Sequence, residues 1–172
     1  MRNGISRTVR RAVGVATAGA SMALCLASSP ASAAAGVAPM MYVNANSGKC
    51  LEVADWRTDN GAPVRQWDCS GQPNQAWYDL GRDPNPYYGD LENQHSGKCL
   101  EVADWRTDNG APVRQWDCTG QPNQRWMIRS STGGVVVVNK HSGKCLEVAD
   151  WRTDNGAPVR QWDCSGQPNQ KW

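Results

Sequence analysis

The sequence predicts an all-β protein in which three near-identical repeats close into one three-fold body. Three observations lead to this prediction: one segment occurs three times in 172 residues, its apolar and polar residues alternate, and six of the seven cysteines recur at one fixed spacing. Alternation of this kind is typical of half-buried strands. No stretch sustains the apolar heptads of a coiled coil, and nine Trp residues are unlike an intrinsically disordered chain.

The first 33 residues have the layout of a secretion signal. Arginines precede an apolar stretch at 12–26, and an Ala-Ser-Ala sequence at 31–33 fits a cleavage site. The apolar stretch is short for a membrane span. We therefore expect a signal peptide at 1–33, a folded domain at 34–172, a secreted, extracellular protein and no membrane span.

The net charge of +2 gives a misleading picture of the folded domain. Four arginines lie before residue 34, where no acidic residue occurs, so the remainder holds 14 basic and 16 acidic residues. A nucleic-acid-binding domain is usually strongly basic. We therefore expect no nucleic-acid partner.

Six cysteines in the expected domain form three pairs, each nineteen positions apart. An even number of cysteines in a secreted chain indicates a disulfide framework. Because the three contexts are identical, we expect the local bridges Cys50–Cys69, Cys99–Cys118 and Cys145–Cys164. Each closes a loop of about 20 residues and stabilises the fold by roughly 3 kcal/mol. Zinc is the competing interpretation, but the domain has no Cys-x-x-Cys motif. We expect no metal and no cofactor.

Only two positions vary among the three copies of the repeated segment. The copies lie at 47–77, 96–126 and 142–172, within repeats of about 41–82, 90–129 and 136–172. Repeats of this length indicate an array, a propeller or a closed three-fold body. A unit of about 46 residues cannot bury its own apolar face. Three units can do so together if each sends one Trp to a shared centre. The equivalent residues Trp77, Trp126 and Trp172 suit this position.

Each copy contains a regular succession of short elements. In the first copy, alternating residues at 50–53 predict a strand, and an Asn-Gly pair at 60–61 predicts a turn. A second alternating stretch covers 64–69, and a turn at 71–73 leads into a further strand. Between copies, the valine run at 135–138 is a clear strand. The expectation is four short strands per repeat, about twelve in all, and no helix.

Three Gln-x-Trp motifs lie in register with the cysteine pairs, at 75–77, 124–126 and 170–172. Together with Cys-Leu-Glu-Val at 50–53 and Asn-Gly at 60–61, they resemble the ricin B-type lectin family. Secreted actinobacterial lectins and the carbohydrate-binding modules of plant-wall hydrolases look most similar. The resemblance implies a β-trefoil with pseudo-three-fold symmetry and up to three carbohydrate sites, one per repeat.

The resemblance also implies which residues contact the sugar. In the family an acidic residue after the first cysteine accepts hydroxyl hydrogen bonds, an aromatic residue stacks on the sugar, and an Asn completes the polar set. These roles fall on Glu52, Trp67 and Asn74, with Asp55 beside the pocket. The equivalent residues in the other copies are Glu101, Asp104, Trp116, Asn123, Glu147, Asp150, Trp162 and Asn169. An indole suits the C–H face of a sugar ring, and carboxylates suit its hydroxyls.

Two departures from the family pattern leave alternatives open. Glu52 replaces the usual Asp and is one methylene longer, so a pocket sized for Asp is either blocked or shifted, with Asp55 able to take over as the main acceptor. Arg65 replaces a common Gln, so it either pairs with Glu52 and quenches the site or recognises an acidic sugar. Trp56 either widens the aromatic platform or covers the disulfide. All three copies share these changes.

We expect a monomeric, non-enzymatic carbohydrate-binding protein without catalytic residues. Three equivalent weak sites would provide avidity for polysaccharides. The alternative is a protein-binding or inhibitory β-trefoil scaffold with degenerate sugar pockets. A glycosidase is disfavoured because it needs two carboxylates in unlike environments, whereas nearly every acid here is triplicated in one context.

Overall fold

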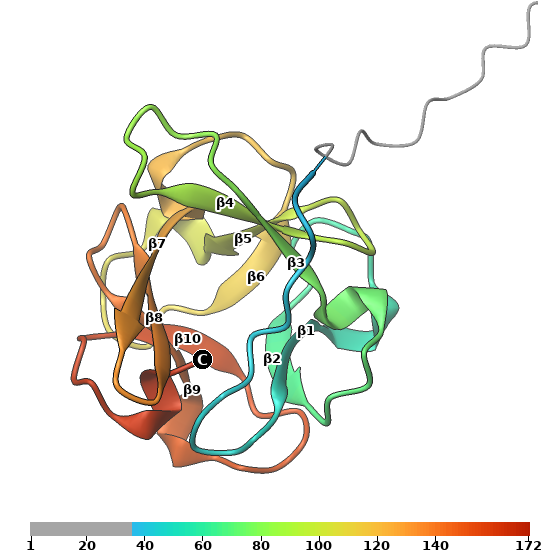
Figure 1. Cartoon of the computed structure of the whole chain (residues 1–172), viewed down its shortest axis with the longest axis vertical. Helices are drawn as coiled ribbons and strands as arrows, with labels where there is room; N and C mark the ends of the chain where they lie inside the picture. Colours follow the sequence, from blue (N-terminus) through green and yellow to red (C-terminus); the bar gives the residue numbers. More distant parts are fainter. Residues whose placement is uncertain (1–35) are drawn as a thin grey trace, which may run out of the picture. The chain divides into compact units, whose positions relative to one another are not determined.

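The computed structural model describes residues 36–172, and the expected signal peptide at 1–33 lies outside them. Within the described range the chain forms strands and short 3-10 turns around a common centre (Figure 1). That range contains no α-helix, and thus none that could cross a membrane. The prediction of an all-β protein is confirmed.

Ten strands make up the three repeats. The first repeat holds β1 (Cys50–Val53), β2 (Val64–Trp67) and β3 (Trp77–Leu80). The second holds β4 (Gly89–Asn93), β5 (Cys99–Val102), β6 (Val113–Trp116) and β7 (Arg125–Ser131). The third holds β8 (Gly134–Asn139), β9 (Cys145–Val148) and β10 (Val159–Trp162). Eight strands form one sheet, with the path β10-β9-β8-β7-β4-β5-β6 and β3 paired to β4, while β1 and β2 form a separate hairpin.

The expectation of about twelve strands is corrected to ten within residues 36–172. The segment before β1 contributes only single bridges, from Met40 to Trp77 and from Val43 to Cys50. Trp172 exchanges two backbone hydrogen bonds with Val135, at 2.8 and 2.9 Å, without extending into a strand. Both segments contact the sheet where strands were expected, but neither forms a continuous ladder.

The hairpins β1–β2, β5–β6 and β9–β10 share one antiparallel register. In the first hairpin the facing pairs are Cys50 with Trp67, Leu51 with Gln66, Glu52 with Arg65 and Val53 with Val64. Because side chains alternate along a strand, Leu51 and Val64 point to the core while Glu52, Arg65 and Trp67 share the outer face. One disulfide staples each hairpin, and the three bridges are Cys50–Cys69, Cys99–Cys118 and Cys145–Cys164.

The tryptophans of the three Gln-x-Trp motifs are buried in one hydrophobic core, as the repeat argument predicts. Each indole N–H donates to a backbone carbonyl of its own repeat, at 2.9 to 3.1 Å. These pairs join Trp77 to Leu51, Trp126 to Leu100 and Trp172 to Leu146. A buried indole needs such a partner because an unpaired N–H would lose its hydration without compensation.

A ring of buried glutamines joins the repeats to one another. Gln66 is 0% exposed, and its Nε2 donates to the carbonyls of Arg152 and Asp154 in the third repeat, at 3.0 and 3.1 Å. Its Oε1 accepts a hydrogen bond from Ser47 Oγ. The equivalent bonds run from Gln115 to Arg57 and Asp59, and from Gln161 to Arg106 and Asp108. We call Gln66, Gln115 and Gln161 the glutamine ring. Each repeat is thus bonded to both of the others.

Replacement of Gln115 by alanine tests the importance of the glutamine ring. The change removes the side-chain donor of the part-buried Arg57 and Asp59 carbonyls and the acceptor of the Ser96 hydroxyl, so we expect a loss of about 2–4 kcal/mol in the free energy of unfolding. Urea denaturation of the oxidised protein measures this loss. The matched control is Gln94→Ala at an exposed position, which should change stability by less than about 0.5 kcal/mol. Equal stability of the two variants would contradict a structural role for the ring.

Candidate functional site

Three equivalent hollows, of about 350 to 410 Å³, open on the outer faces of the three hairpins. We call them the repeat hollows. Every site residue expected from the sequence lines the hollow of its own repeat. The first hollow contains Glu52, Asp55, Trp67 and Asn74, the second Glu101, Asp104, Trp116 and Asn123, and the third Glu147, Asp150, Trp162 and Asn169.

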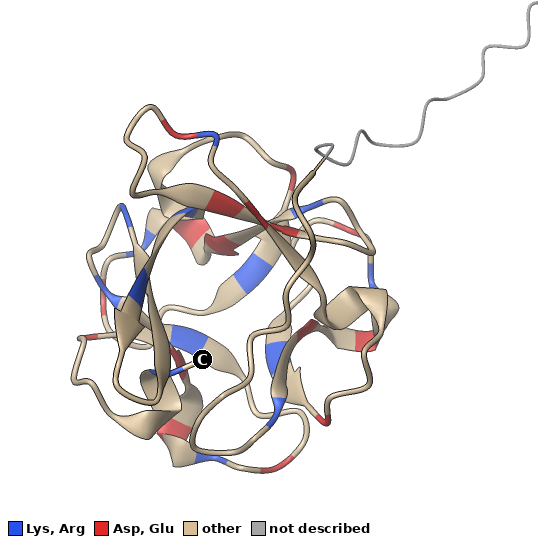
Figure 2. Ribbon diagram, in the orientation of Figure 1, with Lys and Arg blue, Asp and Glu red and all other residues tan. Residues whose placement is uncertain are grey.

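Arg65 is the central side chain of the first hollow. Its Nε donates to Glu52 Oε1 at 2.9 Å, which follows from their facing positions in the hairpin. Its Nη2 donates to Asp55 Oδ1 at 3.0 Å. Its guanidinium carbon lies 4.3 Å from the ring centroid of Trp67, within the range of a cation–π contact. Figure 2 shows a basic segment at the same place on β2, β6 and β10, which corresponds to Arg65, Arg114 and Arg160.

Glu52 forms the base of the hollow and is only 4% exposed. Its Oε1 is occupied by Arg65, and its Oε2 accepts from Gln75 Nε2 at 3.0 Å and from Asn74 Nδ2 at 3.4 Å. Asn74 is also buried and donates to the carbonyl of Val53 at 3.2 Å. Both oxygens of Glu52 are therefore engaged by neighbouring side chains of the protein, and Glu52 and Asn74 lie buried at the base of the hollow.

Asp55 lies at the rim, and its side chain is 71% exposed. The kink at η1 (Ala54–Trp56) places both Asp55 and Trp56 in the left-handed region, with φ of 54° and 55°. Two consecutive non-glycine residues in this region cost of order 1–3 kcal/mol each, and such strain concentrates at functional sites. The same pair of angles occurs in the other two repeats. The kink leaves Trp56 exposed at the wall of the hollow.

Trp67 supplies the aromatic surface and is 37% exposed. Its ring edge packs against the Asn-Gly turn of the third repeat, where a Cβ on Gly156 would lie 3.7 Å from Cζ3. Gly156 has a φ of +85°, which favours glycine. The neighbouring repeat therefore holds the indole in place.

One position of the repeat received no role in the sequence analysis because its residue type differs between copies. It is Asn46 in the first repeat, His95 in the second and His141 in the third. The structure gives all three the same contact. His95 Nε2 donates to the carbonyl of Trp56 at 3.2 Å, and Asn46 Nδ2 donates to that of Trp151 at 3.3 Å. In each repeat, the carbonyl of the Trp in the left-handed region thus accepts a hydrogen bond from the Asn or His side chain of a neighbouring repeat. Only the tertiary contact reveals this equivalence.

Charged pairs surround the hollow. Lys49 pairs with Asp68, and Asn155 of the third repeat donates to Asp68 Oδ2 at 2.7 Å. These hydrogen bonds, that of Lys49 foremost, hold the pKa of the Asp68 carboxyl below its usual value. Because Lys49 neutralises Asp68, the charges that remain are Glu52 and Asp55 against Arg65. Each hollow therefore carries a net charge of about −1.

One group of potential metal ligands occurs within residues 36–172, formed by Glu92, Cys99 and Cys118. The two sulfurs belong to a disulfide and are not thiolates. A single carboxylate then remains, which is no zinc site.

Comparisons with known proteins agree with this architecture. The family model for the ricin-type beta-trefoil lectin domain matches residues 38–172. A search of curated proteins found no match. The designed three-fold symmetric protein ThreeFoil is 39% identical, with a TM-score of 0.73 over 77% of this chain and 94% of its own.

Natural proteins show the same fold. The exo-beta-1,3-galactanase 1,3Gal43A from Clostridium thermocellum is 34% identical, with a TM-score of 0.75, over 78% of this chain but only 29% of the enzyme. The C-half of the earthworm R-type lectin, solved with GalNAc, is 18% identical, with a TM-score of 0.61, over 78% of this chain and 95% of its own. At that identity the likeness concerns the fold alone. The resemblance drawn from the Gln-x-Trp motifs and the predicted β-trefoil are confirmed, and the chain belongs to the ricin-type β-trefoil lectin family.

Proposed function

We propose that the protein binds carbohydrate through the three repeat hollows. One observation carries the proposal: in each hollow a partly exposed indole lies beside an exposed carboxylate on a rigid, disulfide-stapled hairpin. An aromatic surface and a hydrogen-bond acceptor in one hollow suit the apolar face and the hydroxyl rim of a sugar ring. Membership of a lectin family supports the same conclusion.

The contacts within the hollow suggest a different role in sugar binding for each of its residues. Trp67 stacks on the sugar, and Asp55 accepts hydroxyl hydrogen bonds, since Arg65 occupies only its Oδ1. Glu52 and Asn74 act from below by fixing Arg65, which in turn orients Trp67 and Asp55. Of the alternatives left open by the sequence, this assignment favours Asp55 as the main acceptor. Trp56 also lines the hollow and extends the aromatic surface.

The arrangement favours binding over catalysis. A glycosidase needs one carboxyl group that donates a proton and a second that acts as base or nucleophile. Both oxygens of Glu52 already accept hydrogen bonds, one from Arg65 and one from Gln75, so neither is free to act on a substrate. The galactanase match covers less than a third of that enzyme, and its activity does not extend to this chain.

Three hollows on one rigid body support multivalent binding. A single shallow sugar site commonly has a free energy near −4 kcal/mol, about a millimolar Kd. Simultaneous engagement along a polymer raises the apparent affinity by about 10²-fold or more when the spacing fits. We also propose that the protein acts outside the cell, since its three disulfides persist in oxidising surroundings and residues 1–33 have the composition of a signal peptide.

Removal of the stacking surface tests the proposed function. We expect the triple variant Trp67→Ala, Trp116→Ala and Trp162→Ala to lose at least about tenfold in affinity for any polysaccharide that the parent protein binds. A glycan array identifies the ligand, and calorimetry measures the loss. The matched control replaces three exposed arginines outside the hollows, through Arg57→Ala, Arg106→Ala and Arg152→Ala. Undiminished binding in the tryptophan variant would instead favour a scaffold that binds through another surface.

The charge of the hollows predicts selectivity. A uronic acid brings a carboxylate close to a net charge of about −1, which disfavours binding by roughly 1 kcal/mol, or about fivefold. We therefore expect a neutral galactan to bind better than a galacturonan of similar length. Calorimetry at low and high salt checks this, because salt should narrow the difference. A preference for the acidic polymer would show instead that Arg65 and its equivalents recognise the carboxylate.

A further inference from the structure

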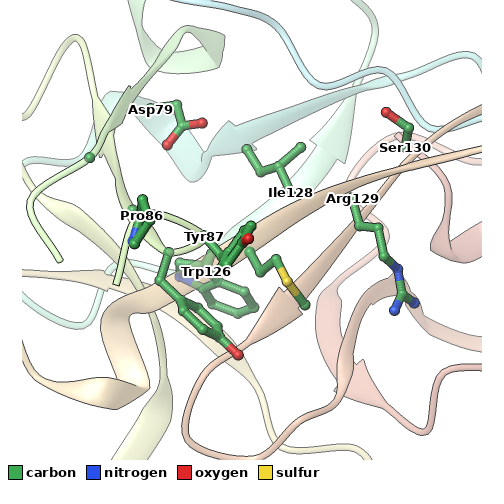
Figure 3. Close-up of a pocket in the computed structure, with 11 residues that line it drawn as sticks. Asp79, Pro86, Tyr87, Trp126, Ile128, Arg129 and Ser130 are labelled. Atoms are coloured by element: carbon green, nitrogen blue, oxygen red, sulfur yellow. The ribbon is translucent and has the colours of Figure 1, made fainter. Parts of the chain in front are cut away.

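A further hollow, of about 530 Å³, lies outside the three repeat hollows. It opens between the linker at 81–89 and β7, and we call it the linker hollow (Figure 3). Residues that contribute to its wall include Asp79, Pro86, Tyr87, Trp126, Ile128 and Arg129. The other two repeats lack this linker sequence.

Asp79 differs from the other acids that lie outside the repeated segments. Asp83 pairs with Lys140 at 2.7 Å, Asp90 with Arg125 at 2.7 Å and Glu92 with Arg82 at 2.8 Å. Asp79 has no ion pair or hydrogen bond of its side chain within residues 36–172, and it is half-buried. Burial alone raises the pKa of its carboxyl, with no neighbouring positive charge to lower it. Its ionised form is therefore poorly compensated in the free protein.

The surroundings of Asp79 leave its carboxylate open to a ligand. Gly89 allows the close approach of the side chain, because a Cβ there would lie 2.5 Å from Asp79 Oδ1. Figure 3 shows Asp79 at one side of the hollow and the Arg129 side chain extending away from it. Tyr87, which is 73% exposed, and Ile128 offer apolar surface between them.

We propose that the linker hollow binds an amino sugar, with the ammonium group on Asp79 and the sugar ring against Tyr87 and Ile128. A cation compensates the half-buried carboxylate directly, which a neutral hydroxyl does only in part. The tyrosine ring adds attraction for the cation and for the C–H face of the sugar. The positive charge of the ligand follows from Asp79, whereas its identification as a sugar rests on the proposed function.

The site differs from the repeat hollows in one physical respect. In those hollows Arg65 and its equivalents already occupy an oxygen of each rim carboxylate, and the rim is largely solvated. In the linker hollow no cation of the described chain reaches the carboxylate. Discrimination between a charged amine and its neutral N-acetyl form should therefore be strongest there.

The test uses the oxidised protein with Trp67→Ala, Trp116→Ala and Trp162→Ala, in which the repeat hollows are disabled. The probes are the trisaccharide of glucosamine and the trisaccharide of N-acetylglucosamine, followed by amide chemical shifts in NMR. We expect the glucosamine trisaccharide to shift the amides of Gly89 and Ile128, and the acetylated form to bind at least about tenfold more weakly. Equal binding of the two probes, or shifts confined to other parts of the domain, would overturn the proposal.

Asp79→Asn in the same background separates charge from shape. We expect it to weaken glucosamine binding by at least about tenfold, and unchanged binding would overturn the proposal. If this variant fails to fold, Tyr87→Ala at an exposed position replaces it, and a loss of affinity is again expected. The two proposals fail separately. If the parent protein binds sugar but the Gly89 amide does not shift, only the proposal for the linker hollow is overturned. If the Gly89 amide shifts in the tryptophan variant, the linker site is supported even when the repeat hollows bind nothing.

Discussion

The glutamine ring is the interaction on which the rest of the structure depends. Three identical units can bury their apolar faces only against one another, and Gln66, Gln115 and Gln161 make each contact specific. The same junction completes the candidate sites. The turn at Gly156 supports Trp67, and His95 holds the strained Trp56 through its carbonyl. The contacts that join the three repeats therefore also hold the residues that line the repeat hollows.

The pairing of Glu52 with Arg65 explains why two unusual residues occur together in every copy. A buried carboxylate is costly unless it is both charge-compensated and hydrogen-bonded. The longer glutamate reaches Gln75 and Asn74 with one oxygen, and Arg65 neutralises the other. The guanidinium that compensates the buried acid also lies on Trp67 and holds Asp55. Glu52 without Arg65 would leave a buried carboxylate without its charge partner.

The repeated segments and the unrepeated linker at 81–89 create different kinds of hollow in this protein. The repeated segments give three equal hollows, which suit a polymer with repeating units. The linker at 81–89 has no counterpart in the other repeats, and it adds a single hollow of different charge character. The linker's one acid, Asp83, pairs with Lys140 and Arg125, and Asp90 in the adjoining strand β4 also pairs with Arg125, so these contacts fasten the linker to the sheet. Asp79 is the exception that remains open to a ligand.

The sequence by itself determined the all-β class, the hairpin pairing of cysteines and the buried Gln-x-Trp tryptophans, because each follows from local alternation or from triplicated spacing. It also located the residues that line the hollows. It did not determine that Glu52 would accept hydrogen bonds from Asn74 and Gln75, or that Gln66 would bond to Arg152. Such contacts depend on cross-strand register and on the packing of residues far apart in the chain. The reduction of the outermost strands to bridges has the same origin, since a strand forms only where its neighbours offer a continuous ladder.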